Sequence, residues 1–202
     1  MILTIAIIVV TSIISFIAFG NRRVLERLIL WPPAVSRQHQ YDRLITYGLV
    51  HADPTHLIFN MLTLFFFGGV MEQVYRHFLG EFGFLVFYAG GLVVSILPTF
   101  LANRDNAGYR SLGASGAVSA VLFAFILLRP WATIYVYVLP VPAIVYAVLY
   151  VGYSIYMDRR AGDHVNHSAH LWGAAYGVAF TLLMNPHLFS VFVANLMHPD
   201  SR

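Results

Sequence analysis

The sequence contains no cysteine and no lysine, and charged residues are scarce. Without cysteine, the 202-residue chain has no disulfide, no thiolate metal site and no thiol nucleophile. Charged residues make up 10% of the chain, whereas soluble domains contain about 25%. Hydrophobic residues make up 59%. This composition excludes an ordinary soluble globular protein, and it excludes a disordered chain, which needs high charge and low hydrophobicity.

The basic residues do not indicate binding to nucleic acid. All 12 are arginines, and the formal net charge is only +3. They are distributed over the stretches between apolar segments and form no continuous basic face. A nucleic-acid partner is therefore not expected, because such binding needs a basic patch or stripe. The expected surroundings are a lipid bilayer.

Long apolar segments predict an all-α polytopic membrane protein with six helices in one domain, residues 1–202. The first segment continues into Asn21-Arg22-Arg23 without a basic start, which favours an uncleaved span over a signal peptide. The fifth segment contains Pro140 and Pro142, so we expect it to be kinked or irregular there. The predicted spans cover about residues 2–19, 56–75, 82–101, 112–129, 132–156 and 168–186.

The connector between the first two predicted spans, residues 20–55, has a mixed composition. It contains five arginines and apolar stretches that are too short to cross a bilayer. Such stretches are typical of segments that lie at the membrane surface. We therefore expect an interfacial loop in this region.

Three clusters of polar residues lie where a membrane protein is expected to be apolar. They cover residues 51–60, 113–116 and 169–177, at the N-terminal ends of the second, fourth and sixth predicted spans. Even-numbered spans all run in the same direction, so the clusters share one side of the membrane and a similar depth. Polar residues at apolar positions are costly and usually face the interior of the helix bundle.

Small residues in two of these clusters predict close helix packing. Gly116 in the fourth span and Gly173 in the sixth allow their backbones to approach. This approach would bring Ser115 and His170 within hydrogen-bonding distance. A serine nucleophile paired with a histidine base is the minimum set of catalytic groups for acyl transfer.

The first cluster adds two side chains that can donate hydrogen bonds. His56 and Asn60 are four residues apart and therefore lie on one face of a helix. Both are suited to stabilise the oxyanion that develops when a serine attacks a carbonyl group. A purely structural alternative remains open, in which the two side chains hold neighbouring helices together.

In order and spacing, these motifs resemble the rhomboid intramembrane serine proteases over about residues 43–180. The resemblance implies a six-helix fold, no cofactor and no metal. Ser115 would be the nucleophile and His170 its general base, without a carboxylate. The oxyanion hole would combine His56, Asn60 and the Ser115 amide, and His51 would support the surrounding loop. The motifs are His51-x4-His56-x3-Asn60, Gly113-Ala-Ser115-Gly116 and Ala169-His170-x2-Gly173-x3-Gly177.

Three further positions bear on this resemblance. Arg43 falls where the family has a Trp-Arg pair, but Asp42 replaces the tryptophan, and Glu72 resembles a glutamate of the second span. In a subset of the family, an aromatic residue four positions after the serine stacks on the catalytic histidine. Here that position is Ser119, so another residue would have to orient His170.

The resemblance implies transmembrane-helix proteins as substrates and peptide-bond hydrolysis as the reaction. The absence of an organellar targeting segment favours the plasma membrane of a bacterium or archaeon. Nine arginines in the loops after odd-numbered spans, against three elsewhere, place the N-terminus outside by the positive-inside rule. The family topology places it in the cytoplasm with the active site opening outward, and we expect the family topology.

Two other functions remain open at this point. His164, His167 and His170 are spaced three apart and suit zinc, with His51 or His56 as a further ligand, in a transporter or metalloenzyme. Against this, no carboxylate accompanies these histidines inside a span. The chain would alternatively be a non-catalytic rhomboid-like protein that binds membrane helices. Such relatives typically lose the serine or the histidine, and both are present here.

Overall fold

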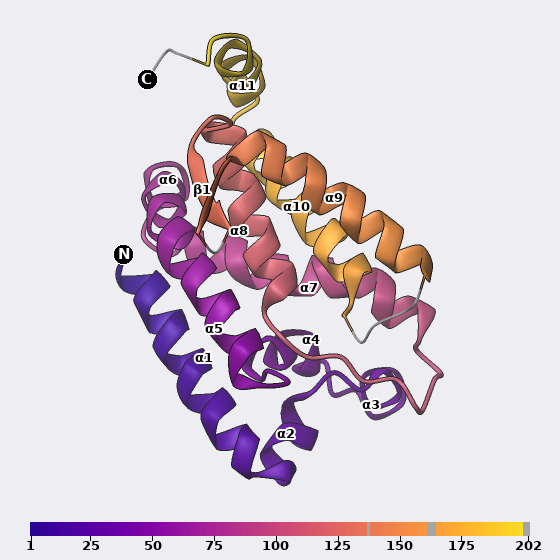
Figure 1. Cartoon of the computed structure of the whole chain (residues 1–202). Coiled ribbons are helices and arrows are strands. Elements are labelled where there is room, and N and C mark those ends of the chain that lie inside the picture. Colours follow the sequence, from indigo (N-terminus) through magenta and orange to yellow (C-terminus); the bar gives the residue numbers. More distant parts are fainter. Residues whose placement is uncertain (137, 161–164, 200–202) are drawn as a thin grey trace.

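The computed structural model describes residues 1–136, 138–160 and 165–199 (Figure 1). Most of this chain is helical, as the composition predicts, and one small hairpin is the only sheet in the described part. The elements are α1 (Ile2–Gly20), α2 (Arg22–Leu28), α3 (Pro32–Gln38), α4 (Arg43–Thr46), η1 (Tyr47–Leu49), α5 (Pro54–Thr63), η2 (Leu64–Gly68), α6 (Gly69–Leu79), α7 (Gly83–Ala102), α8 (Ser115–Leu128), β1 (Thr133–Val136), β2 (Leu139–Pro142), α9 (Ala143–Arg160), α10 (His167–Met184) and α11 (His187–Met197).

Three helices in the described chain are long and apolar enough to cross a membrane. They are α1, α7 and the continuous helix Pro54–Leu79, which joins α5, a π-helical turn η2 and α6. The pair α10 and α11 qualifies together as a fourth, but the two helices meet at a bend of 115°. α8 is apolar but shorter. Six spans therefore remain a prediction.

Helix α1 shows the inverted polarity of a membrane helix. Its buried residues are Thr4, Thr11, Ser15 and Ala18, whereas large apolar residues such as Phe16 are exposed. Small and polar residues face the neighbouring helices because lipid solvates the apolar ones outside. The exposed apolar surface is thus the surface expected to contact lipid.

A carboxylate on α6 fixes the start of α1. Glu72 is buried and accepts hydrogen bonds from the backbone N–H groups of Leu3 (3.2 Å) and Thr4 (2.8 Å). It also accepts one from the Thr4 hydroxyl, at 2.6 Å. These donors are groups that the first turn of a helix leaves unpaired, and the helix dipole favours a negative charge there. The contact explains why a carboxylate is tolerated inside the bundle.

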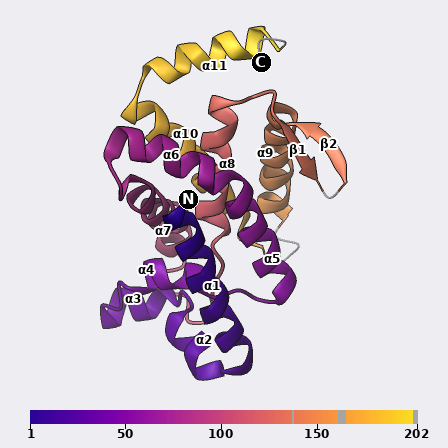
Figure 2. The same cartoon turned by 90° about the vertical axis from the view of Figure 1, so that its left-hand side faces the viewer.

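Helix α8 lies inside the bundle, between α5, α7, α9 and α10 in both views (Figures 1 and 2). All residues from Gly116 to Leu127 are buried, which is the pattern of a helix surrounded by other helices. Its 14 residues span about 21 Å, less than the roughly 30 Å of a bilayer core. This short central helix begins at Ser115.

Backbone contact joins α8 to α10, as the small residues predict. A Cβ atom on Gly173 would lie 2.0 Å from the carbonyl oxygen of Gly116, and one on Gly177 would lie 2.2 Å from that of Ala120. Real Cβ atoms do not approach so closely, so only glycine fits at either position. The two helices are therefore held in a register that depends on both glycines.

The expected fifth helix begins later than predicted. Residues 133–136 and 139–142, placed in the predicted span 132–156, instead form two antiparallel strands in which Thr133 pairs with Pro142 and Tyr135 with Pro140. Proline lacks the N–H that a helix interior needs and its ring clashes with the preceding turn. A two-stranded ribbon has only edge strands, where proline is tolerated. Helix α9 starts at Ala143, directly after the second proline.

The connector between α1 and α5 folds as short helices around one buried arginine. Arg43 donates hydrogen bonds to the carbonyl oxygens of Glu26 (2.9 Å) and Ile29 (2.6 Å) and to Gln40 Oε1 (2.6 Å). The two carbonyl oxygens belong to the unpaired groups at the end of α2, and the third acceptor is a side chain that lies just before α4. Leu30 in this connector forms a β-bridge with Ser111, which ties it to the segment before α8. Its placement at the membrane surface remains a prediction.

Candidate active site

Ser115 and His170 are brought together by the contact of α8 with α10. Ser115 Oγ lies 2.8 Å from His170 Nε2, and both side chains are half-buried. In the tautomer with hydrogen on Nδ1, the imidazole accepts the hydrogen bond from the serine hydroxyl. This is the arrangement in which a histidine can take the proton of a serine nucleophile.

The turn before α8 is built to place Ser115 at the helix start. Gly113 has φ of +106°, a conformation that glycine adopts without strain. Its backbone N–H donates to the Tyr47 carbonyl oxygen at 2.9 Å. A Cβ at this position would lie 2.6 Å from His56 Cε1, so the lack of a side chain also admits the His56 ring. Gly113 thus sets both the backbone and the space around the site.

His51 supports this turn through both ring nitrogens. Its Nε2 lies 3.4 Å from the Ala114 backbone N, and its Nδ1 lies 3.0 Å from Ser15 Oγ. The Ser15 hydroxyl donates to the Leu49 carbonyl oxygen at 2.9 Å, so Nδ1 must donate to Ser15. Nε2 then accepts from the Ala114 N–H. His51 is therefore neutral with its hydrogen on Nδ1, and it links α1 to the residue before Ser115.

The surroundings of His51 keep it neutral. Its side chain is 2% exposed, and burial together with the nearby His56 lowers its pKa to about 3, although Asp53 acts in the opposite direction. Protonation would place a hydrogen on Nε2, where the ring accepts from Ala114. The network is thus compatible with neutral pH and is lost in acid.

His56 and Asn60 lie on one face of α5, as their spacing predicts. The His56 ring packs edge to face against His51, with the ring centroids 4.9 Å apart. Asn60 is buried and donates one amide hydrogen to the His56 carbonyl oxygen at 3.0 Å. A carboxamide has two such hydrogens, so a second donor remains on Asn60. Their role toward an oxyanion remains a prediction.

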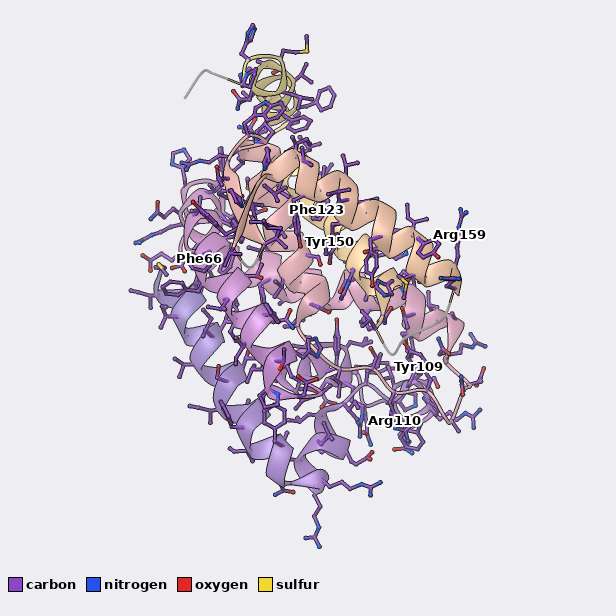
Figure 3. All side chains as sticks on the ribbon, viewed as in Figure 1. Phe66, Tyr109, Arg110, Phe123, Tyr150 and Arg159 are labelled. Carbon is purple, nitrogen blue, oxygen red and sulfur yellow. The ribbon has the colours of Figure 1, made fainter. Side chains whose placement is uncertain are left out.

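Sequence reasoning missed Tyr150 (labelled in Figure 3), whose ring lies against the candidate base. This residue of α9 has its ring stacked on His170, at 6.0 Å between centroids and 25° between planes. Its hydroxyl shares a hydrogen bond of 2.6 Å with Ser119 Oγ. Tyr146 and Tyr150 are four residues apart, which indicates an aromatic face of α9 but not its partner. Ser15 was also missed, because it is one of four hydroxyl residues in the apolar run of residues 2–19 and nothing in the sequence distinguishes it from the others.

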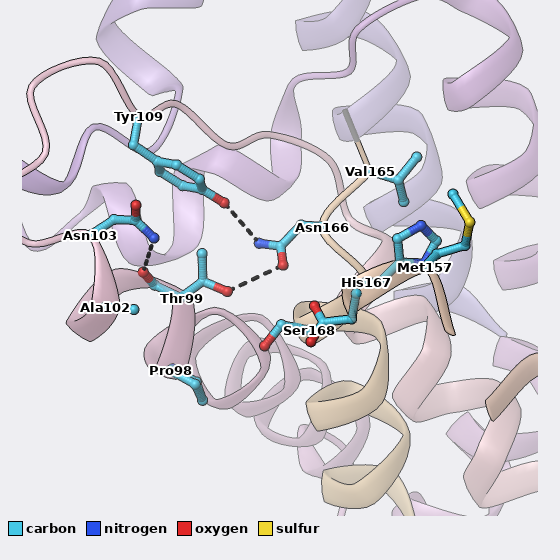
Figure 4. A pocket seen from close by; sticks show the side chains of 11 residues that line it. Pro98, Thr99, Ala102, Asn103, Tyr109, Met157, Val165, Asn166, His167 and Ser168 are labelled. Atoms are coloured by element: carbon cyan, nitrogen blue, oxygen red, sulfur yellow. Dashed lines mark hydrogen bonds between the residues drawn. The ribbon is translucent and has the colours of Figure 1, made fainter. Parts of the chain in front are cut away.

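A pocket of about 300 Å³ lies beside the site, at the start of α10 (Figure 4). Tyr109, Asn166 and Thr99 line it and are joined by hydrogen bonds of 3.4 and 3.2 Å through the Asn166 amide. His167 also lines it, and its ring lies edge to face with His170 at 5.7 Å. Ser115 and Asn60 do not line this pocket.

The described part of the chain provides no set of ligands for the zinc hypothesis. Among residues 1–136, 138–160 and 165–199, no three histidine or carboxylate side chains are grouped so as to hold a metal ion. His164, which belongs to that hypothesis, lies outside the described residues. Among the histidines that it shares with the serine site, His170 is directed at Ser115.

Known proteins resemble this chain over 45–75% of its length. The Rhomboid domain profile matches residues 38–187. RHOMBOID-like protein 12, mitochondrial, of Arabidopsis thaliana is 33% identical over 147 residues, covering 65% of this chain and 43% of the plant protein. Putative rhomboid protease YdcA of Bacillus subtilis is 33% identical over 97 residues, covering 45% of this chain and 46% of that protein. Rhomboid protease GlpG of Haemophilus influenzae is 26% identical over 152 residues, covering 75% and 73%. The chain thus spans less than half the length of the first two relatives.

Proposed function

The chain belongs to the rhomboid family, and we propose that it is a serine endopeptidase that cleaves membrane proteins in or near their transmembrane helices. The observation that carries this proposal is the distance of 2.8 Å between Ser115 Oγ and His170 Nε2. The names of two bacterial relatives describe rhomboid proteases, which supports the same activity.

Ser115 and His170 act together in both steps of the proposed reaction, formation of an ester and its hydrolysis. Ser115 Oγ attacks the scissile carbonyl carbon while His170 Nε2 takes the hydroxyl proton, which gives a tetrahedral oxyanion. The oxyanion collapses, the carbon–nitrogen bond breaks, and His170 returns the proton to the leaving amine. Ser115 is left as an ester. A water molecule, deprotonated by His170, then hydrolyses the ester and restores the hydroxyl.

Under this proposal, three donors stabilise the oxyanion. The backbone N–H of Ser115 lies in the first turn of α8, where helical N–H groups have no partner within the helix. His56 lies over Gly113, two residues before the serine, and Asn60 follows one turn later on α5. Donors fixed in advance at a water-poor site supply a large share of such rate enhancements.

The position of Ser115 in the helix bundle bears on the class of substrate. Ser115 begins a short helix inside the bundle, so a substrate must bring its peptide bond to it from the bilayer side or the rim. Helical carbonyl groups are already hydrogen-bonded, so the substrate helix must unwind locally before attack. We therefore propose substrates with small or helix-destabilising residues near the cut. The proposed location is the plasma membrane of a bacterium or archaeon, with the site opening outward.

Cleavage of a reporter with one transmembrane helix, in liposomes, tests the proposal. Ser115→Ala and His170→Ala should each lower the rate at least about 10³-fold. Ser190→Ala is the matched control, because Ser190 on α11 also lies next to a histidine nitrogen, His187 Nδ1 at 3.1 Å, but is exposed. It should cleave like the wild type. Activity that survives in Ser115→Ala, or that a metal chelator removes, would overturn the serine mechanism.

A further inference from the structure

The His170 ring contacts the Ser115 hydroxyl, the Tyr150 ring and the His167 ring, and the first two bear on its orientation toward the nucleophile. Its edge meets Ser115 Oγ at 2.8 Å, and its face meets the Tyr150 ring with a centroid distance of 6.0 Å and an interplanar angle of 25°. This distance and angle fall in the range of offset-stacked aromatic pairs. A hydrogen bond alone leaves an imidazole free to tilt about the bond, whereas a stacked neighbour limits that tilt.

Tyr150 is itself tied to the helix that carries the serine. Its hydroxyl shares a hydrogen bond of 2.6 Å with Ser119 Oγ, and Ser119 is 4% exposed. Ser119 follows Ser115 by four residues and so lies one turn further along the same face of α8. The group that contacts the base is therefore positioned by the same helix that positions the nucleophile.

Two aromatic neighbours fill the space around the Tyr150 ring. Phe123 on α8 (labelled with Tyr150 in Figure 3) lies at 5.5 Å between centroids, and Tyr146 on α9 lies at 5.7 Å. Phe123 is buried, and it follows Ser119 by one helical turn. Displacement of the Tyr150 ring would require this cluster to repack, so the ring is a firm support for His170.

We propose that Tyr150 is the positioning residue for His170, and that Ser119 orients Tyr150 through their shared hydrogen bond. Position 119 is where the family resemblance leads one to expect an aromatic ring against the base. In this chain the ring comes instead from α9, and the serine at 119 supplies its anchor. The inference rests on the proposed function, because the orientation of His170 affects a rate only if His170 is the base.

Two substitutions separate the ring from its hydroxyl. Tyr150→Leu removes the stacked ring and should lower kcat by about tenfold or more while KM stays unchanged, because an aromatic pair of this kind contributes on that order. Tyr150→Phe keeps the ring and should retain more of the activity. Tyr146→Phe is the matched control. It removes a tyrosine hydroxyl one turn away and should leave kcat unchanged.

A double-mutant cycle tests the anchor. Tyr150→Phe and Ser119→Ala break the same hydrogen bond, so the double variant should lose no more kcat than either single variant. If Tyr150→Leu fails to fold, this cycle still tests whether Ser119 orients Tyr150. Thermal unfolding is measured for every variant, since a purely structural role predicts that kcat losses follow stability and not the presence of the ring.

The outcomes distinguish this inference from the function on which it rests. A wild-type chain without Ser115-dependent cleavage would overturn both. A wild-type chain that cleaves, with a Tyr150→Leu variant of equal kcat, would overturn the positioning role alone. Additive losses in the double-mutant cycle would refute the Tyr150–Ser119 anchor. A loss of kcat in Tyr150→Leu, partly restored in Tyr150→Phe at equal stability, supports the positioning role.

Discussion

Replacement of Gly173 by alanine is the sharpest steric test of how α8 and α10 create the site. The new methyl would lie 2.0 Å from the Gly116 carbonyl oxygen, and even the shortest contact that Cβ atoms make, 3.0 Å, requires a movement of about 1 Å. Its partner is backbone, so the helices themselves must separate. Overpacking of this kind costs about 1–3 kcal/mol of folding stability.

The same movement reaches the candidate dyad. Gly116 directly follows Ser115, and Gly173 lies one turn after His170, so a separation at the glycines lengthens the distance of 2.8 Å between the two side chains. A misplacement of about 1 Å costs about 10²-fold in rate. We therefore expect Gly173→Ala to reduce cleavage of the liposome reporter by that factor.

A matched control excludes a general effect of alanine. Gly152 on α9 is exposed, and a Cβ there would meet no atom within 4 Å. Gly152→Ala should keep the activity and thermal stability of the wild type. If Gly173→Ala also matched the wild type in both measurements, the backbone contact would not be what places His170 against Ser115.

Three further predictions concern the oxyanion donor Asn60, the supporting residue His51 and the orientation of the chain in the membrane. Asn60→Ala should lower kcat by about 10²–10³ with little change in KM if its amide acts on the oxyanion, and unchanged kcat would assign that role to backbone N–H groups alone. The His51 pKa is lowered to about 3 in the folded chain, from 6.5. Above pH 6.5 its full contribution to stability is present. As pH falls toward 3, only the unfolded chain takes up the proton, and the unfolding temperature should drop. His51→Gln should flatten this dependence, and an equally steep dependence in the variant would exclude His51 as its source. In a chain without native cysteine, Arg159→Cys should react with a membrane-impermeant maleimide in intact cells and His77→Cys only after lysis. The reverse pattern would place the site on the cytoplasmic face.

The helical architecture follows from the sequence because lipid imposes a simple rule. Apolar runs of sufficient length predict helices, and α1, α7 and α10 begin and end within two residues of the predicted spans. The hairpin before α9 was not predicted, because an apolar run gives no periodicity to separate a strand from a helix. Pro140 and Pro142 predicted an irregularity in this segment but did not predict that it would be a hairpin.

The parts of the candidate site that sequence motifs specify were predictable, whereas the parts that depend on helix packing were not. Ser115 and His170 were expected to meet because glycines on two parallel helices permit it, and the structure brings them together. Tyr150 was not expected. Its contact with His170 depends on the rotation of α9 about its axis, which no local pattern specifies. The serine at position 119 showed only that another residue had to orient His170.

The most direct test of the central claim is chemical labelling of the nucleophile. A fluorophosphonate reacts with a serine hydroxyl that an adjacent base has activated, and mass spectrometry locates the adduct. We predict one adduct, on Ser115, which is lost in His170→Ala and retained in Ser190→Ala. An unlabelled Ser115 in the folded wild type, or labelling that persists without His170, would contradict the Ser115–His170 dyad.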